Sequence, residues 1–204
     1  MKGSILIISG PSGSGKSSLM KELLKTSDDI YFSISTTTRE IRVGEEEGVN
    51  YYYISQEEFQ NDIKEDAFLE WAKVHENYYG TSLKPILKAL EDGKLVVFDI
   101  DVQGHEIARR KFGNLITSVF LTTANQKILR QRLEARQTDS KDSIDQRISN
   151  ALEEMARMRE YDYLLINDNF EDTFEKLKAI AEASRYKISA LDTQEFTDFW
   201  ANKD

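Results

Sequence analysis

The 204-residue sequence contains no cysteine and only two prolines, Pro11 and Pro85. The absence of cysteine excludes disulfides, thiolate zinc sites and a cysteine nucleophile. No low-complexity stretch, internal repeat or linker interrupts the sequence. Hydrophobic residues make up 40% of the chain and aromatic residues 10%, which is enough for the core of one compact unit. We therefore predict a single domain over 1–204.

Positively charged residues are outnumbered, since the sequence has 27 Lys and Arg and 36 Asp and Glu, which gives a formal net charge of −9. A protein that binds duplex nucleic acid carries a basic face, so we expect no nucleic-acid partner. A few arginines gathered in a cleft still suffice to attract phosphate. The apolar stretch near the N-terminus covers only Ile5 to Ile8, too short for a signal peptide or a membrane span. We expect a cytoplasmic protein with no membrane partner.

Short β-branched runs predict buried parallel strands at 4–9, 95–100, 116–121 and 163–166. Segments with apolar residues at helical spacing lie between and around these runs, at 16–25, 84–90, 104–111, 126–135, 143–158 and 170–186. The alternation predicts an α/β fold, in which right-handed crossovers build a parallel sheet flanked by helices.

Residues 33–82 break this alternation, because they are rich in aromatic residues and contain one plausible short helix, at 55–64. We predict an inserted β-rich lobe there. A second unusual stretch, within 126–150, is dense in arginine and predicts an exposed helical lid. The core would then consist of the three remaining segments, 1–32, 83–125 and 151–204.

The C-terminal tail from residue 188 contains Phe196, Phe199 and Trp200. We expect either a helix that packs on the core or a contact in a homodimer, and the sequence leaves both open.

A phosphate-binding loop is predicted at 10–17, where GPSGSGKS fits the pattern G-x-x-x-x-G-K-[ST]. Glycines allow backbone N–H groups to point inward, and the N-terminus of the following helix adds positive potential. Lys16 would reach the β- and γ-phosphates, and the Ser17 hydroxyl would bind Mg²⁺. Asp99, at the end of a buried strand, is the second candidate for the Mg²⁺ site.

Two arginines in the inserted lobe, Arg39 and Arg42, lie three positions apart beside several hydroxyl residues. Guanidinium groups bind phosphate bidentately, and Tyr51 and Tyr79 could add neutral donors. Taken singly, each arginine also fits a solvated surface charge, and each tyrosine fits a packing role. We interpret the acidic run 45–47 as a solvated turn.

Several sequence blocks resemble the guanylate kinase family, in the family's order and over 3–186. The blocks are 35–53, 68–72 (FLEWA), 77–81 (NYYGT), 99–104 (DIDVQG), 132–136 (RLEAR) and 161–168. The resemblance implies the P-loop nucleoside monophosphate kinase fold, with a GMP-binding lobe and a lid. It also implies Mg²⁺-dependent transfer of the ATP γ-phosphoryl group to GMP, and to dGMP, in purine nucleotide metabolism.

The resemblance further implies a role for each matching residue. The ATP phosphates would bind Gly10, Pro11, Ser12, Gly13, Ser14, Gly15, Lys16, Ser17 and Ser18, with Asn167 near the adenine. The GMP phosphate would bind Arg39, Arg42, Tyr51 and Tyr79. Guanine would donate to Glu70 and Asp101 and accept from Ser35 and Thr81. Lys16 and Arg39 would act in catalysis together with the lid residues Arg132, Arg136 and Arg147.

One lid position departs from the family pattern, because Gln137 stands where a glycine commonly follows the second arginine. Because this residue can stiffen the lid or alter its path, the resemblance defines the roles of Arg136 and Arg147 less closely than those of Arg39 and Arg42.

The chemistry of guanine supports the base assignment. Its Watson–Crick edge presents two donors and one acceptor, and carboxylates with hydroxyls complement that edge. Adenine would direct its N1 lone pair at a carboxylate. Sites of this kind discriminate by about 10⁴ or more, so we expect GMP to be strongly preferred to AMP.

Two other functions compete with this one. Guanylate-kinase-like domains in scaffold proteins bind phosphopeptides without catalysis, but they typically lack the intact loop that Lys16 and Ser17 complete here. A P-loop kinase for another phosphorylated acceptor would leave Glu70, Asp101 and Ser35 without a base to recognise. A substrate panel separates these functions.

Overall fold

The computed structural model describes residues 3–135, 140–191 and 193–201. Within these ranges, a five-stranded sheet with strand order β2-β7-β1-β8-β9 forms the centre of the molecule. Every pair of neighbouring strands in it is parallel. The strands are β1 (Ser4–Ser9), β2 (Ile30–Phe32), β7 (Leu95–Asp99), β8 (Ile116–Thr122) and β9 (Tyr163–Ile166). The predicted α/β class is confirmed.

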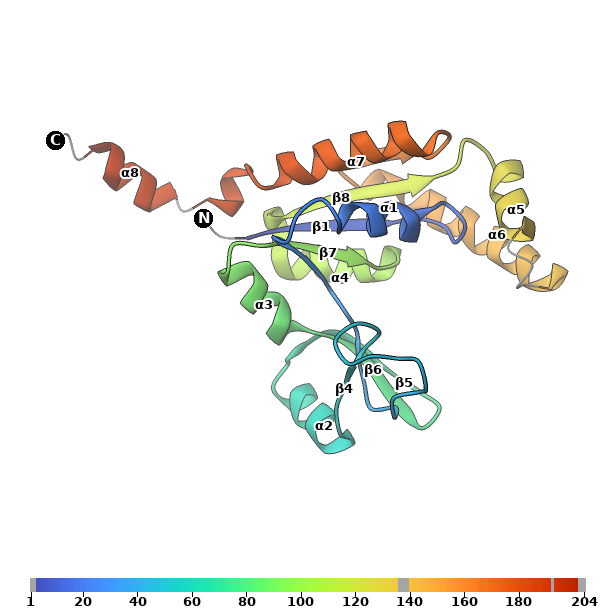
Figure 1. Cartoon of the computed structure of the whole chain (residues 1–204), viewed down its shortest axis with the longest axis horizontal. Helices are drawn as coiled ribbons and strands as arrows, with labels where there is room; N and C mark the ends of the chain where they lie inside the picture. Colours follow the sequence, from blue (N-terminus) through green and yellow to red (C-terminus); the bar gives the residue numbers. More distant parts are fainter. Residues whose placement is uncertain (1–2, 136–139, 192, 202–204) are drawn as a thin grey trace.

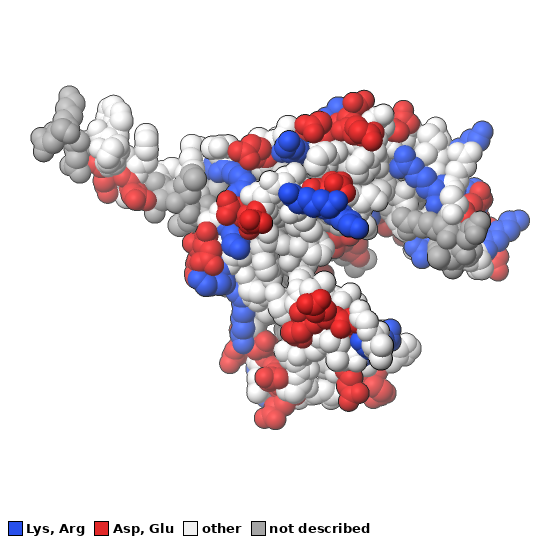
Figure 2. All heavy atoms as spheres, in the orientation of Figure 1, with Lys and Arg blue, Asp and Glu red and all other residues white. Residues whose placement is uncertain are grey.

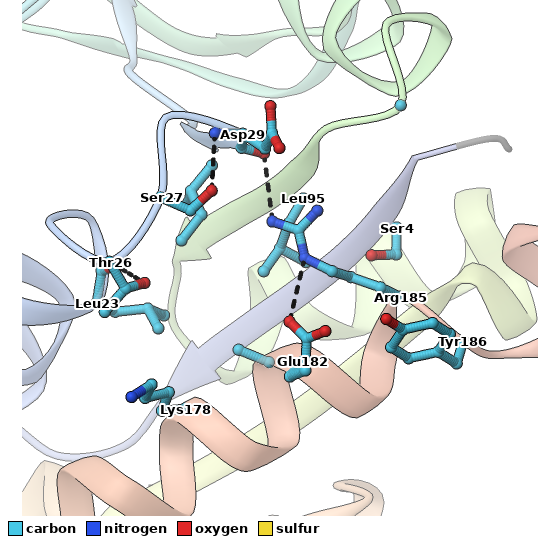
Figure 3. Close-up of a pocket in the computed structure, with 13 residues that line it drawn as sticks. Ser4, Leu23, Thr26, Ser27, Asp29, Leu95, Lys178, Glu182, Arg185 and Tyr186 are labelled. Atoms are coloured by element: carbon cyan, nitrogen blue, oxygen red, sulfur yellow. Dashed lines mark hydrogen bonds and ion pairs between the residues drawn. The ribbon is translucent and has the colours of Figure 1, made fainter.

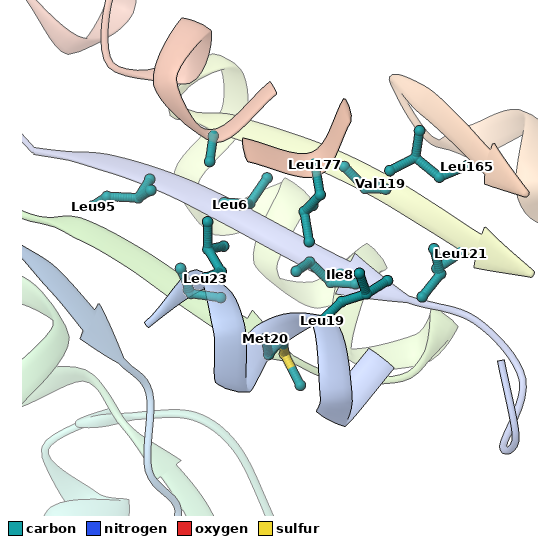
Figure 4. Packing of buried hydrophobic residues seen from close by; sticks show 12 residues of the cluster. Leu6, Ile8, Leu19, Met20, Leu23, Leu95, Val119, Leu121, Leu165 and Leu177 are labelled. Atoms are coloured by element: carbon teal, nitrogen blue, oxygen red, sulfur yellow. The ribbon is translucent and has the colours of Figure 1, made fainter. Parts of the chain in front are cut away.

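Helices cover both faces of this sheet (Figure 1). On one face lie α1 (Lys16–Leu23) and α7 (Phe170–Ser184), which pack against Leu6 and Ile8 of β1 (Figure 4). On the other face lie α3 (Leu83–Glu91) and α4 (Val102–Phe112), which pack against Ile5 and Ile7. Because successive side chains of a strand point to opposite faces, β1 is apolar on both sides and buried throughout.

Strand β2 was not expected from the sequence. It has three half-buried residues, and Ile30 pairs with Leu95 at the edge of the sheet. A run this short carries too little periodicity to be recognised as a strand.

The segment 33–82 contains a second sheet, with strand order β4-β3-β6-β5, as the sequence predicted. Its core is aromatic, because Phe59 is fully buried and stacks on Phe68 and Tyr78, with ring centroids 4.2 and 5.3 Å away. The elements are β3 (Thr36–Thr37), β4 (Tyr52–Tyr53), α2 (Gln56–Lys64), β5 (Phe68–Val74) and β6 (Asn77–Ser82).

Two helices, α5 (Gln126–Ala135) and α6 (Lys141–Ala156), form the region predicted as a lid. They have a small core of their own, made of Leu129, Leu133, Ile144, Ile148 and Ala151. Figure 2 shows open space between these helices and the inserted lobe. The predicted lid residues Arg136 and Gln137 lie outside the described residues.

Helix α8 (Thr193–Ala201) projects away from the sheet (Figure 1) and has no buried residue. Phe196, Phe199 and Trp200 are 66%, 79% and 75% exposed. The expectation that a helix of the tail packs on the core is therefore wrong, although Ala190, just before this helix, is buried. The physical reason is that α1, α7, α3 and α4 already cover both faces of the sheet. The homodimer contact stays a prediction.

Three single-turn 3₁₀ segments complete the described elements, at Gly113–Leu115, Met158–Glu160 and Ile188–Ala190. None of the described helices is long and apolar enough to cross a membrane.

Candidate active site

A cavity of about 360 Å³ opens at the carboxyl ends of β1 and β7, the edge of a parallel sheet where α/β proteins bind ligands. The phosphate-loop residues and two segments distant in sequence surround it. Its lining is Gly10, Ser12, Gly13, Gly15, Lys16, Ser17, Asp99, Ile100, Asp101 and Glu154. The fold therefore brings the predicted donor loop against Asp99 and Asp101.

The loop has the backbone shape that its glycines permit. Gly10, Gly13 and Gly15 have φ of 137°, 92° and 101°, values that L side chains rarely adopt. Gly15 is the N-cap of α1 and provides no side-chain cap. The N-terminus of α1, with the positive end of its helix dipole, therefore follows the loop directly, an arrangement that favours an anion.

Gly15 also lies against a buried amide. A Cβ on Gly15 would lie 2.2 Å from Asn167 Nδ2. Asn167 is 4% exposed, and its Nδ2 donates to the Ser14 carbonyl over 2.7 Å. Asn167 thereby holds the backbone of the phosphate loop in place at Ser14.

Gly15→Ala is expected to lower the free energy of unfolding by about 1–3 kcal/mol, because it adds a clash to an unfavourable φ. Urea unfolding measures this loss. The control is Gly44→Ala, where φ is 89° and a Cβ would meet nothing within 4 Å. Equal losses in the two variants would contradict the constraint that we assign to Asn167.

Lys16 lies over the loop, and its ammonium donates to the backbone oxygens of Gly10 and Pro11. Its positive charge acts on Asp99, which faces the same cavity. Loss of hydration raises the pKa of Asp99, and the attraction of Lys16 opposes that rise.

Ser17 and Asp99 line this cavity together and offer the oxygen donors that Mg²⁺ prefers. Among the described residues, no group of three or more His, Cys, Asp or Glu side chains could hold a metal ion. A Mg²⁺ ion at Ser17 and Asp99 would therefore complete its coordination with phosphate oxygens and water, as this ion commonly does. The residues present fit the ion.

Two predicted lid arginines reach the phosphate loop. Arg132 of α5 donates to the carbonyl oxygens of Ser14 (3.3 Å) and Asn167 (2.8 Å). Arg147 of α6 donates to Ser12 Oγ over 2.7 Å. The third, Arg136, falls outside the ranges that the structure describes.

A second cavity, of about 360 Å³, lies behind the loop and brings Ser18 and Asn167 beside Arg132. Its other lining residues are Gly13, Gly15, Asp168 and Phe170. Phe170 offers an aromatic ring that a base could stack on. The place of Asn167 near the adenine stays a prediction.

Three of the residues predicted to recognise guanine lie together. Glu70 of β5 is opposite Thr81 of β6, and a Cβ on Gly104 of α4 would lie 3.3 Å from Glu70 Oε2. Asp101 is the N-cap of α4, and its Oδ1 accepts from the backbone N–H groups of Gln103 (2.9 Å) and Gly104 (2.8 Å). Its second carboxylate oxygen takes no part in this cap.

The electrostatics of this group are set by its two carboxylates. Burial, and then the negative charge of Asp101, raise the pKa of Glu70, while a hydrogen bond with Thr81 opposes the rise. Ser35, the fourth predicted residue, lies immediately before β3, and its carbonyl accepts from the Tyr52 N–H over 2.9 Å. The contact of its hydroxyl with guanine stays a prediction.

The residues predicted to hold the acceptor phosphate form a second group in the lobe. The Arg39 guanidinium carbon lies 5.6 Å from the centroid of the Tyr51 ring, and the Tyr51 and Tyr79 rings are 6.0 Å apart. Arg42 is exposed, and its backbone N–H donates to Glu45 over 2.9 Å.

The interpretation of 45–47 as a solvated turn is wrong for Glu45, whose carboxylate forms several hydrogen bonds within the lobe. Its carboxylate accepts from Arg39, from the Arg42 backbone and from Tyr53. The run of three acidic residues gave no signal that one of them is enclosed, because this depends on which side chains the lobe brings near.

Glu154 was also missed. It comes from α6 and lines the cavity at the phosphate loop, together with Lys16 and Asp101. Burial raises the pKa of Glu154, Lys16 opposes this rise and Asp101 adds to it. Helix α6 contains several acidic residues, and nothing in their spacing distinguishes the one that faces the cavity.

The largest of these cavities, of about 480 Å³, lies at the opposite end of β1 and β7, beside Ser4 and Leu95 (Figure 3). Arg185, one of the cationic residues that line it, contacts the Asp29 carbonyl (3.5 Å) and the Glu182 carboxylate (3.9 Å). None of the predicted site residues lines it. Volume alone therefore does not locate the site in this fold.

Comparisons with known proteins agree with these observations. Residues 2–184 match the family model described as guanylate kinase. A guanylate kinase of Sulfurimonas denitrificans is 52% identical over 97% of this chain and 96% of its own length. One of Campylobacter jejuni is 50% identical over 98% of both chains. The crystal structure of guanylate kinase from Anaplasma phagocytophilum superposes with a TM-score of 0.72 at 27% identity, covering 100% of this chain and 98% of that one. The chain with this phosphate loop and inserted lobe belongs to the guanylate kinase family.

Proposed function

We propose that this protein transfers the γ-phosphoryl group of ATP to GMP, and also to dGMP, giving ADP and the nucleoside diphosphate. The observation that carries this function is the cavity at the phosphate loop, at the carboxyl ends of β1 and β7. It brings Lys16 and Ser17 of the phosphate loop against Asp101, whose neighbour Glu70 completes a pair of carboxylates suited to guanine. The reaction takes place in the cytoplasm, which holds both nucleotides.

The two substrates bind to different parts of the chain. The loop 10–18 holds ATP, with Asn167 on the adenine side. Guanine binds Ser35, Glu70 and Thr81 of the lobe together with Asp101 of the core. The GMP phosphate binds the lobe residues Arg39, Arg42, Tyr51 and Tyr79. Mg²⁺, held through Ser17 and Asp99, supplies charge neutralisation at the phosphates when bound.

The reaction needs little covalent help from the protein. The attacking atom is a phosphate oxygen of GMP that is already anionic, so no general base is required. Lys16, Arg132, Arg136 and Arg147 stabilise the charge of the transferring phosphoryl group. The lobe 33–82 and the lid 126–150 close on the core 1–32, 83–125 and 151–204, which aligns the two anions and excludes water.

The test is a coupled assay of ADP formation with ATP and Mg²⁺, which offers GMP, dGMP, AMP, CMP and UMP in turn. We expect turnover with GMP and dGMP and at least about 10⁴-fold lower kcat/KM with AMP. Turnover only with a phosphorylated sugar would contradict the proposal and favour another P-loop kinase. Folded protein that turns over none of these acceptors would favour a binding module.

We also propose that α8 joins two copies of the chain. Aromatic side chains bury about 150–250 Å² each, so Phe196, Phe199 and Trp200 offer roughly 400–500 Å² per copy. Tyr186 and Ile188, 66% and 72% exposed, extend this surface. The total approaches the ~800 Å² per partner of a specific interface.

Sedimentation velocity tests this contact. We expect the wild type to be a dimer at micromolar concentration and Phe199→Glu to be a monomer, because the new charge would be buried at the interface. Gln194→Glu adds the same charge on the opposite side of α8 and is expected to stay dimeric. A monomeric wild type would refute the contact.

A further inference from the structure

The Glu45 carboxylate lies at the centre of the lobe's phosphate-binding group. Arg39 Nη2 donates to both of its oxygens, over 2.8 and 2.9 Å. Its Oε2 also accepts from the Arg42 backbone N–H (2.9 Å) and the Tyr53 hydroxyl (2.8 Å). The Arg39 and Glu45 side chains are only 12% and 19% exposed. This is a largely buried ion pair with several hydrogen bonds, unlike a typical surface pair.

Glu45 is ionised in this arrangement. The hydrogen bond from the Arg42 backbone has the largest effect, and with those from Arg39 and Tyr53 it lowers the pKa of Glu45 to about 2, against the opposing effect of burial. A carboxylate that accepts several hydrogen bonds keeps its charge far into acid. Its charge is therefore constant over the pH range of any activity assay.

Arg39 is held from several sides. The Glu45 carboxylate accepts from Nη2, and the Glu40 carbonyl accepts from Nη1 over 2.7 Å. The Tyr51 and Tyr53 rings lie 5.6 and 5.8 Å from the guanidinium carbon. A guanidinium group has five N–H donors, and the hydrogen bonds to Glu45 and the Glu40 carbonyl come from Nη2 and Nη1. Tyr79, which is predicted to bind the acceptor phosphate, also interacts with this guanidinium group. The donors that Glu45 and Glu40 do not use can bind a phosphate, together with the Tyr79 hydroxyl, while Glu45 keeps its own contacts.

We propose that Glu45 is a positioning residue, which holds Arg39 and the Arg42 backbone in the geometry that binds the phosphate of the acceptor nucleotide. This inference rests on the proposed function. An arginine side chain loses substantial rotamer entropy when it is fixed. Glu45 fixes Arg39 in advance, so that less of the binding free energy is spent on ordering it.

A different geometry would make Glu45 a competitor, whose carboxylate occupies the place of the phosphate and leaves when GMP binds. The contacts argue against it. Departure of Glu45 would break its hydrogen bonds with the Arg42 N–H and the Tyr53 hydroxyl as well as with Arg39 Nη2. A phosphate in its place would have to replace all of these charge-assisted hydrogen bonds before it gained any binding free energy.

The test compares two ligands that differ only in the phosphate. GMP and guanosine are titrated by NMR into the wild type, Glu45→Gln and the control Glu46→Gln, which removes the charge of an exposed neighbour. We expect Glu45→Gln to weaken GMP binding by about 10–100-fold, the effect of losing hydrogen bonds to a charged group. Guanosine binding and KM for ATP should stay within about twofold of the wild type, as should all values for Glu46→Gln.

Guanosine binding also shows that the lobe of the variant is folded. Equal loss of GMP and guanosine affinity would overturn the inference, because Glu45 would then support the lobe as a whole. Tighter GMP binding would overturn it in favour of the competitor. Unchanged GMP binding would show that Arg39 needs no support from Glu45.

A double-mutant cycle isolates the partner. In an Arg39→Ala background, Glu45→Gln should weaken GMP binding clearly less than it does in the wild type, because only the Arg42 backbone is then left for Glu45 to position. A full loss in that background would contradict action through Arg39. Failure of the proposed function looks different, since wild-type protein would then neither bind GMP nor turn it over.

Discussion

Lys16→Ala is expected to lower kcat for GMP phosphorylation by about 10²–10³-fold and to change KM for GMP by less than about threefold. Lys16 lines the cavity with Ser17 and Asp99, and its ammonium lies at the backbone oxygens of Gly10 and Pro11. In the proposed reaction it would neutralise charge that develops during phosphoryl transfer, an interaction that a preorganised site makes strong. Steady-state kinetics with the coupled ADP assay measures both constants.

The control for this experiment is Lys25→Ala. Lys25 is exposed and forms a surface ion pair with Glu22 over 2.7 Å, a pair that contributes little. Its removal should leave kcat unchanged. If Lys16→Ala raised KM for ATP and left kcat intact, Lys16 would bind ground state and transition state equally, and its role in catalysis would be wrong.

Glu70→Gln is expected to lower kcat/KM for GMP by about 10²–10³-fold, because an acceptor of guanine hydrogen bonds becomes partly a donor. The amide NH₂ would face the N1–H and 2-amino groups of the base. Because AMP does not use this acceptor, the GMP to AMP ratio of kcat/KM should fall with it. Glu76→Gln, at an exposed position of the same lobe, is the matched control.

The same carboxylate predicts the acid limb of the pH profile. The pKa of Glu70 is raised, first by burial and then by Asp101, so Glu70 becomes protonated at a pH above its ordinary 4.5. As pH falls through that raised pKa, Glu70 loses its acceptor character, and kcat/KM for GMP should fall. In Glu70→Gln this limb should disappear. A wild-type profile that stays flat down to pH 4.5 would contradict the assignment.

This acid limb is distinguishable from unfolding. An acid whose pKa is higher in the folded protein binds its proton more tightly there than in the unfolded chain. Protonation of Glu70 therefore favours the folded state as pH falls. Thermal unfolding measured at the same pH values should show no loss of stability that depends on Glu70.

The sequence by itself determined the parts of this protein that depend on neighbouring residues. The loop 10–17 needs glycines and Lys16 at fixed spacing, and its context between a strand and a helix is equally local. The alternation of apolar segments gave the α/β class, and the aromatic residues of 33–82 gave the inserted sheet. Resemblance to a family then supplied roles for residues such as Glu70 and Arg39, which singly would fit ordinary surface charges.

Only the tertiary structure decided which of many similar side chains meet. Asn167 lies 153 positions from the Ser14 carbonyl to which it donates, and Arg147 lies 135 positions from Ser12. Glu45 and Glu154 come from acidic segments whose other members face solvent, and their enclosure follows from the packing around them. Helix α8 has an apolar stripe, yet both faces of the sheet are already covered. Such contacts join residues that are far apart in the chain. Local sequence patterns cannot predict them, because only the folded arrangement brings these residues within hydrogen-bond distance.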